Sequence, residues 1–202
     1  MVSFFIDLFH ILCYDHCRER VYERAKKLYE SENGKYCDGI AHHWYSGDHF
    51  GELKAFYERY PEKCNIASEG CCAIVGEGIR QEKDLEFAEH YAHDILGCFR
   101  NGLSAYCDWN LTLDEKNGPY HNRTGRGCSA EAPVYCNKQT GELVFRSSYY
   151  YIGQVSRFVK RGAKVIVYGN ESDVKTEKSI GIKTVDPEKA YSIMWSNLCG
   201  RP

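Results

Sequence analysis

Four apolar stretches compatible with β-strands constrain the fold of this chain more than any other feature of its sequence. They cover residues 11–14, 39–45, 65–71 and 103–113. Stretches with helical periodicity follow the first three, at residues 21–30, 50–60 and 84–99. Strands that alternate with helices form parallel βαβ units with right-handed crossovers. The sequence therefore predicts an α/β fold in which all four strands run in the same direction.

Polar and aromatic residues stand where these predicted strands end. They are Asp15 after the first strand, Trp44 and Tyr45 in the second, Glu69 in the third, and Asp108-Trp109-Asn110 in the fourth. The carboxyl ends of parallel strands lie on one face of a sheet, where α/β enzymes place their sites. A carboxylate at a strand end is held rigidly, so Glu69 is the candidate catalytic group.

The pattern changes after residue 113. Residues 114–126 are rich in Gly, Asn and charged residues and predict a long surface loop, and residues 147–158 predict a last helix. Residues 163–168 and 179–184 predict short strands with turn residues between them. We therefore divide the chain into an α/β part, residues 1–160, and a piece of an antiparallel β layer, residues 161–202.

Charge and hydropathy argue against two classes of partner. A net charge of −2 and a pI near 6.4 leave no basic surface for nucleic acid. No apolar run approaches the roughly 18 residues that a membrane span needs. The start of the chain carries Asp7 and His10 and lacks the features of a signal peptide, and 11 scattered cysteines are typical of reduced thiols. These features favour the cytoplasm.

Histidines and cysteines near the predicted strand ends raise the alternative of a metal site. Cys13, His16 and Cys17 form one such group, and His42 and His43 form another. Neither group has the spacing of a CxxC or HExxH motif. A thiol-rich metal-binding protein is therefore a distant alternative, and we predict no metal and no cofactor.

Several motifs along the chain match, in the same order, those of a known family. They are Tyr14-Asp15-His16, Gly39-Ile40-Ala41-His42-His43-Trp44-Tyr45-Ser46-Gly47-Asp48, Ser68-Glu69-Gly70-Cys71, Tyr91-Ala92-His93-Asp94-Ile95, Asp108-Trp109-Asn110-Leu111, Gly118-Pro119, Ala132-Pro133, Tyr150-Tyr151-Ile152-Gly153 and Ser156-Arg157-Phe158. With them the chain resembles the C-terminal half of glycoside hydrolase family 30, the glucosylceramidase-like β-glycosidases. The resemblance covers roughly residues 11–168.

The resemblance implies a fold, an activity and a set of site residues. The fold would be the last strands and helices of a (β/α)8 TIM barrel in residues 1–160, followed by part of a β-sandwich in residues 161–202. The activity would be hydrolysis of a β-glucoside-like substrate with retention, through a glycosyl-enzyme intermediate. Glu69 matches the nucleophile. Trp44, Tyr45 and Trp109 match sugar-contacting aromatics, Asp15, His43 and Asn110 match residues that line or support the site, and Cys71 matches a position beside the nucleophile.

Two features of the family pattern are missing. A retaining glycosidase needs a second carboxyl group as acid and base, and the family's Asn-Glu-Pro motif for it does not occur in this sequence. A barrel also needs eight strands, and only four βα units can be counted. The chain is therefore predicted to be half of a catalytic domain, with the N-terminal half of the barrel as its partner. The competing hypothesis is a non-catalytic remnant or carbohydrate-binding half-domain.

Overall fold

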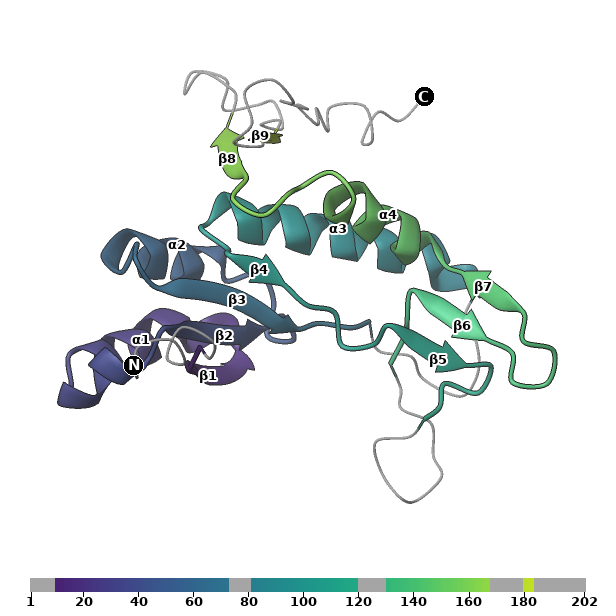
Figure 1. Cartoon of the computed structure of the whole chain (residues 1–202), viewed down its shortest axis with the longest axis horizontal. Coiled ribbons are helices and arrows are strands. Elements are labelled where there is room, and N and C mark those ends of the chain that lie inside the picture. The colour runs from purple at the N-terminus through teal and green to yellow at the C-terminus, as the bar shows by residue number, and fades with distance from the viewer. Residues whose placement is uncertain (1–9, 73–80, 120–129, 168–179, 184–202) are drawn as a thin grey trace, which may run out of the picture.

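A four-stranded parallel sheet forms the centre of the molecule (Figure 1). The structure, a computed structural model, describes residues 10–72, 81–119, 130–167 and 180–183. The strands are β1 (Leu12–Cys17), β2 (Gly39–His43), β3 (Cys64–Glu69) and β4 (Ala105–Tyr106), in the order β1-β2-β3-β4. All their pairings are parallel, which confirms the predicted strand direction.

Four α-helices accompany the strands: α1 (Val21–Tyr29), α2 (Phe50–Arg59), α3 (Asp84–Arg100) and α4 (Ser147–Ser156). Short 3-10 segments lie at Arg18–Arg20, Glu32–Tyr36 and Gln81–Lys83. The predicted helices are confirmed to within a few residues at each end. Helix α3 has acidic residues in its first turn and Arg100 in its last, which suits the helix dipole. Gly102 then takes a φ of +88° against the Tyr57 ring, where a Cβ would clash, so glycine is required there.

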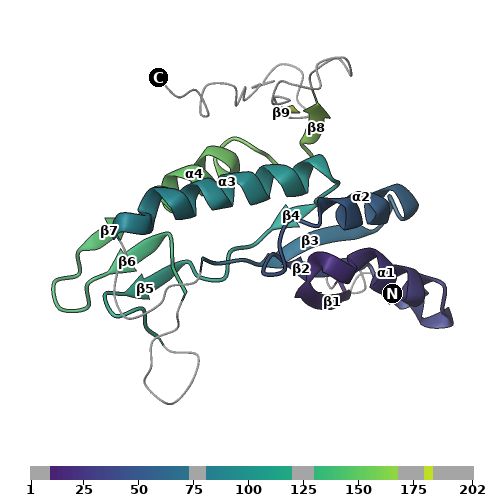
Figure 2. The same cartoon turned by 180° about the vertical axis from the view of Figure 1, so that it is seen from behind.

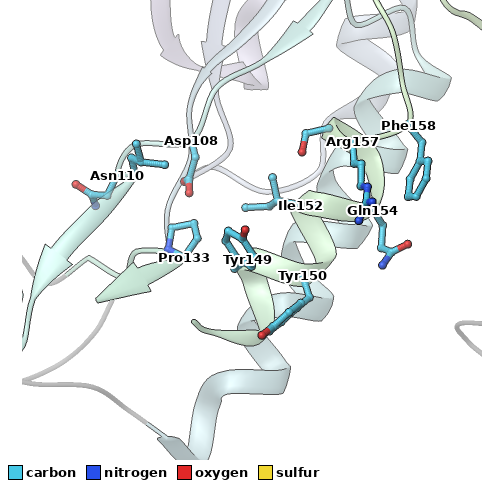
Figure 3. A pocket seen from close by; sticks show the side chains of 12 residues that line it. Asp108, Asn110, Pro133, Tyr149, Tyr150, Ile152, Gln154, Arg157 and Phe158 are labelled. Atoms are coloured by element: carbon cyan, nitrogen blue, oxygen red, sulfur yellow. The ribbon is translucent and has the colours of Figure 1, made fainter. Parts of the chain in front are cut away.

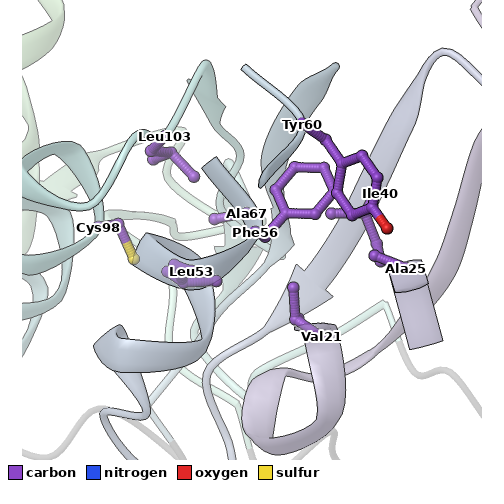
Figure 4. Packing of buried hydrophobic residues seen from close by; sticks show 9 residues of the cluster. All are labelled: Val21, Ala25, Ile40, Leu53, Phe56, Tyr60, Ala67, Cys98 and Leu103. Atoms are coloured by element: carbon purple, nitrogen blue, oxygen red, sulfur yellow. The ribbon is translucent and has the colours of Figure 1, made fainter. Parts of the chain in front are cut away.

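The main hydrophobic core lies between the sheet and helices α1 and α2 (Figure 4). Val21 and Ala25 contribute one face of α1, and Leu53 and Phe56 contribute one face of α2; all four are fully buried. Their spacing of three or four residues is the period that gives an amphipathic helix its apolar stripe. This core fixes β1, β2 and β3 relative to one another, so it also fixes the ends of these strands.

A second core joins α3 to α4, which lie side by side in both views (Figures 1 and 2). Tyr91 and Ile95 of α3 pack with Val155 of α4 and with Trp44 from the loop after β2. The apolar stripe of α3 therefore supports a loop that leaves the carboxyl end of the sheet.

The predicted fourth strand, residues 103–113, is wrong in its extent. Its residues form β4, which is only two residues long, and then β5 (Thr112–Asp114), which belongs to a different sheet with β6 (Val134–Cys136) and β7 (Leu143–Phe145). Strand β5 pairs parallel with β6, and β6 pairs antiparallel with β7. The polar residues 108–110 separate the two strands because their hydrogen bonds go to loops instead of to a neighbouring strand.

The C-terminal part contains a two-stranded antiparallel pair, β8 (Lys164–Val167) and β9 (Ile180–Lys183). This agrees with the predicted antiparallel pairing, but it does not establish a β-sandwich. Most of residues 161–202, much of the predicted loop at 114–126 and the first nine residues lie outside the described residues. Within the described part of the chain, no helix has the length and apolar character needed to cross a bilayer.

Candidate active site

Glu69 is the last residue of β3, and its carboxylate lies among side chains from the neighbouring strand. The Tyr45 hydroxyl donates a hydrogen bond to Glu69 Oε1 at 3.0 Å. His43 Nε2 is 3.8 Å from Glu69 Oε2. The Glu69 side chain is 22% exposed, so it is oriented by these neighbours and remains open to solvent. A carboxylate held in this way can act as a nucleophile or as a general base.

Two β-bulges bring Asp15 and Ser68 together beside this carboxylate. In the pairing of β1 with β2, Asp15 has no partner residue opposite it on β2. In the pairing of β2 with β3, Ser68 has no partner residue opposite it on β2. The two unpaired residues bind each other, because the Ser68 hydroxyl donates to Asp15 Oδ1 at 2.7 Å. Tyr14 and Asp15 have positive φ angles of 81° and 49°, a conformation that costs energy in residues with a side chain. Bulges of this kind re-aim side chains at functional sites.

His43 links Asp15 to Glu69. Its Nε2 lies 3.1 Å from Asp15 Oδ1, and the same nitrogen lies 3.8 Å from Glu69 Oε2. The pKa of Asp15 is lowered, first by the Ser68 hydrogen bond and further by His43. Asp15 therefore stays ionised, and it holds the His43 Nε2 between the Asp15 and Glu69 carboxylates. The structure thus brings Asp15, His43 and Glu69 together at one end of the sheet, and the roles predicted for them stay predictions.

Tyr45 also lies against Cys71, whose Sγ is 3.3 Å from the tyrosine hydroxyl. The Tyr45 pKa is raised far above its ordinary value by burial of the hydroxyl, by Cys71 and by Glu69. The tyrosine consequently keeps its proton and donates it toward Glu69. The residue as a whole is 47% exposed, so part of Tyr45 is open to solvent. Cys71 thus lies beside the candidate nucleophile, as its position in the sequence implied.

Trp44 occupies a different place from the one predicted. Its side chain is only 6% exposed and packs against His90 and Tyr91 of α3, with a ring-centroid distance to Tyr91 of 4.9 Å. The indole N–H donates to the Cys71 carbonyl at 3.1 Å. This burial does not support the prediction that Trp44 offers a flat face to a sugar. The indole instead fixes the backbone just after Glu69.

Trp109 and Asn110 follow β4 and are held by two separate contacts. The Trp109 amide donates to the Gly70 carbonyl at 3.0 Å, which keeps this residue near the end of β3. The Trp109 side chain is 39% exposed and can offer a flat surface. The Asn110 amide donates to the Glu131 carbonyl at 3.1 Å, so its side chain supports the loop that leads to β6.

Asp108 is a half-buried residue that the sequence indicated only as a strand-end residue. Its Oδ1 accepts hydrogen bonds from the Tyr91 hydroxyl at 2.7 Å and from the Trp109 amide at 2.9 Å. Burial raises the pKa of Asp108 to about 7, against the opposing effect of the Tyr91 hydrogen bond. Asp108 therefore joins α3 to the strand end and positions Trp109.

A cavity of about 640 Å³ lies between this loop and α4 (Figure 3). Asp108 and Asn110 line one side, and Tyr149, Ile152 and Phe158 lie among the residues of the other side. Glu69 does not line it. A second cavity of about 440 Å³ lies between α4 and the residues around β4. The β4 edge of the sheet is therefore flanked by open, largely apolar space.

Two buried arginines support the site, and the sequence did not reveal them. Arg18 Nη1 lies 2.5 Å from Asp94 Oδ1, and both side chains are 2% exposed. Arg146 Nε lies 2.9 Å from Glu131 Oε1 and 3.1 Å from Asp84 Oδ1. Arginine in a polar stretch usually indicates solvated surface. The one sequence feature that could have indicated a buried arginine was Asp94, a carboxylate next to the apolar stripe of α3.

The groups considered as metal ligands do not form a metal centre. Within residues 10–72, 81–119, 130–167 and 180–183, no three His, Cys, Asp or Glu side chains are grouped to hold a metal ion. His42 is fully buried, and this burial lowers its pKa to about 3.

Comparison with known proteins identifies the class of protein. The model of the glycosyl hydrolase family 30 TIM-barrel domain matches residues 7–159. Together with the parallel sheet and the carboxylate at its strand end, this match defines a TIM-barrel glycoside hydrolase domain. The chain belongs to glycosyl hydrolase family 30, as its motifs predicted.

Relatives with named activities support this assignment. A putative glucosylceramidase 3 of Caenorhabditis elegans is 29% identical over 136 residues, which are 66% of this chain and 25% of the relative. The lysosomal acid glucosylceramidase of Mus musculus is 25% identical over 159 residues, which are 74% of this chain and 29% of the relative. The chain thus spans between a quarter and a third of these relatives.

Two solved structures share the fold over most of the chain. SrfJ from Salmonella typhimurium superposes with a TM-score of 0.78 and 30% identity, over 89% of this chain and 39% of that protein. An endo-β1,6-glucanase superposes with a TM-score of 0.68 and 28% identity, over 85% of this chain and 39% of that protein.

Proposed function

We propose that this chain is part of a retaining β-glycosidase in which Glu69 is the nucleophile. The observation that carries the proposal is the pair of contacts on the Glu69 carboxylate, with Tyr45 at 3.0 Å and His43 at 3.8 Å. A nucleophilic carboxylate must stay ionised and must point at the anomeric carbon. Tyr45 and His43 hold the Glu69 carboxylate in place at the strand end, and Glu69 remains 22% exposed, so a substrate can reach it.

The proposed substrate is a β-glucoside or a closely related glycoside. The names of the relatives, glucosylceramidase and endo-β1,6-glucanase, support a glucoside. The exposed rings of Tyr45 and Trp109 would contact the sugar. Asp15, His43, Asn110 and Cys71 would support these groups, and Trp44 would hold the backbone after Glu69.

The acid/base carboxyl group would come from a part of the barrel outside this chain. Within the described residues the sheet ends at β1 and at the short β4, and two cavities lie beside β4. An unpaired strand edge next to an apolar cavity is a surface that further strands can cover. We infer that the N-terminal half of the barrel, from the same or another polypeptide, covers it, and that β8 and β9 belong to the associated sandwich.

The nucleophile can be tested by labelling with an activated 2-deoxy-2-fluoro glucoside. An activated leaving group needs little acid assistance, so the experiment tests the nucleophile independently of any acid/base group. The chain would be labelled alone and after co-expression with the first half of the barrel of a family 30 relative. Intact mass and peptide mapping should find one glycosyl group on Glu69.

Matched variants make this test specific. Glu69→Gln should abolish labelling, whereas Glu142→Gln, which changes an exposed carboxylate, should leave it unchanged. Folded protein that acquires no adduct in either preparation would overturn the enzyme proposal and favour a non-catalytic remnant. An adduct on another carboxylate would overturn the assignment of Glu69 alone.

Tyr45→Phe tests the contact that carries the proposal. Loss of one hydrogen bond to a charged oxygen corresponds to about 1.5–3 kcal/mol, so the labelling rate should fall by roughly 10-fold or more. The ring is retained, so sugar stacking should survive. A labelling rate equal to that of the wild type would show that the hydroxyl does not assist Glu69.

The state of assembly tests the proposed barrel half. Without the first barrel half, the chain should self-associate or have low solubility, because nothing in its described part covers the β4 edge and the adjacent cavities. Co-expression with the first barrel half should yield a stable complex. A clean monomer by light scattering with a cooperative melt would contradict this part of the proposal.

A further inference from the structure

Two thiols lie in contact at the end of the sheet opposite Glu69. Cys13 is near the start of β1, and Cys37 precedes β2. Their sulfur atoms are 3.1 Å apart. The nine cysteines among the described residues are all free thiols, and the distance between these two sulfurs is within contact range. A disulfide has an S–S length of about 2.05 Å, so closure requires the sulfurs to move by about 1 Å.

We propose that Cys13 and Cys37 form a reversible intramolecular disulfide, which makes this end of the sheet a redox modification site for small-molecule disulfides such as oxidised glutathione. The bond would join β1, which is an edge of the described sheet, to the segment that leads into β2. The two cysteines are 24 positions apart in the sequence, and the disulfide would close a loop that contains α1.

The surroundings of Cys37 hold its thiol in position. Its Sγ lies 3.0 Å from the Gly39 carbonyl oxygen and 3.4 Å from the Ile11 carbonyl oxygen. The residue is 2% exposed, whereas Cys13 is only partly buried. A small oxidant therefore reaches Cys13 first, and Cys37 is placed to react with the product.

The chemistry balances in two exchange steps. The Cys13 thiolate attacks one sulfur of oxidised glutathione, so a mixed disulfide forms on Cys13 and one glutathione thiolate leaves. Cys37 then loses its proton and attacks the Cys13 sulfur, which expels the second glutathione. Two protein thiols are oxidised, and one small disulfide is reduced to two thiols.

The rate should depend strongly on pH. Burial and the neighbouring Cys37 raise the pKa of Cys13 to about 11, so little thiolate exists near neutrality. Because the thiolate is the attacking species, the first step should accelerate roughly 10-fold per pH unit between about pH 7 and 9. At neutral pH the pair should oxidise slowly and remain reduced in a reducing compartment.

Peptide mapping after oxidation tests the proposal directly. The full chain is incubated with oxidised glutathione at pH 8.5, alkylated and digested with trypsin. Cys13 and Cys17 share the first tryptic peptide because no Lys or Arg precedes Arg18, and Cys37 lies in a separate peptide. We expect these two peptides to be linked in the wild type and in Cys17→Ser, but not in Cys13→Ser.

A trapping variant and a melt complete the test. Cys37→Ser should stop at a glutathione adduct on Cys13, while Cys107→Ser, which lacks an exposed thiol, should still form the linked peptides. The disulfide should raise Tm by about 5–10 °C, as expected for a loop of this length. Absence of the link, or a link that survives in Cys13→Ser, would overturn the proposal.

Discussion

Two regions of the molecule are built around a buried arginine, but they balance its charge differently. Arg18 pairs with one carboxylate, Asp94, and donates from Nε to the Gly47 carbonyl at 2.8 Å, in the loop that carries Trp44 and Tyr45. Arg146 pairs with Glu131 and Asp84. The Glu131 backbone in turn accepts from Asn110, beside Trp109. Each arginine thus supports one side of the candidate site.

The difference lies in the number of carboxylates. At Arg18 the charges cancel, whereas at Arg146 two carboxylates face one cation. Burial raises the pKa of Glu131 to about 7, and the Asp84 charge acts in the same direction, although Arg146 acts in the opposite direction. The comparison teaches that the group around Arg146 can adjust its charge, because Glu131 can take up a proton when its pKa is raised to about 7.

The largest expected effect comes from breaking the balanced pair. Asp94→Ala leaves Arg18 buried without its carboxylate and should lower the free energy of unfolding by about 3–5 kcal/mol. Urea unfolding measures the change. The control is Asp48→Ala, because the Asp48 carboxylate is 58% exposed and pairs with His93, which is exposed as well. This variant should cost about 1 kcal/mol or less. If Asp94→Ala and Asp48→Ala lowered the free energy of unfolding equally, the buried Arg18–Asp94 pair would be no more important for stability than a surface pair.

A smaller, pH-dependent effect is expected from Glu131→Gln. A carboxyl group whose pKa is raised by folding contributes stability below its unfolded pKa of 4.5, and this contribution is lost as pH rises to about 7. The wild type should therefore lose about 1.4 kcal/mol per pH unit relative to the variant across this window.

The measurement is urea unfolding at several pH values. The surface substitution Glu142→Gln serves as the control and should follow the wild type. A difference between Glu131→Gln and the wild type that stays constant from pH 4.5 to 7 would contradict the proposed proton uptake by the triad.

The smallest expected effect is that of Asn110→Ala. It removes the hydrogen bond to the Glu131 carbonyl and should lower the free energy of unfolding by about 1 kcal/mol. In the double variant of Asn110→Ala and Glu131→Gln, the two losses in free energy of unfolding should not add, because both changes act on the Arg146 region. In the double variant of Asn110→Ala and Asp94→Ala, the two losses should add. Additivity in both combinations would show that Asn110 is independent of the Arg146 region.

Much of the fold was predictable because it depends on local periodicity. The apolar spacing of Val21 and Ala25, and of Leu53 and Phe56, indicated α1 and α2, and the parallel strand direction followed from the strand–helix alternation. Glu69 and its neighbours were predicted from motifs, and their proximity agrees with the structure. The short β4 was not predictable, since its end depends on hydrogen bonds to distant loops.

Other parts of the site depend on tertiary contacts that a single sequence does not display. Trp44 resembles a sugar-binding aromatic in its motif, but it is buried because Tyr91 and His90 of α3 cover it. Arg18 and Arg146 look like surface charges until their carboxylates are placed. A sequence motif shows which residue types occur together, but whether a side chain is buried depends on which helices and strands pack against it.

The paired bulges at Asp15 and Ser68 have a consequence for insertions and deletions in this part of the chain. Strands β1 and β3 each carry one residue more than the part of β2 that they pair with, and each extra residue is accommodated separately against β2. Removing residue 68 would leave Glu69 opposite His43, but it would straighten β3 and remove the hydroxyl that donates to Asp15. Removing residue 15 would leave His16 opposite His42, but it would remove the carboxylate that contacts Ser68 and His43. A one-residue deletion at either bulge is therefore compatible with the pairing of the sheet, and its cost falls on the contacts around Glu69.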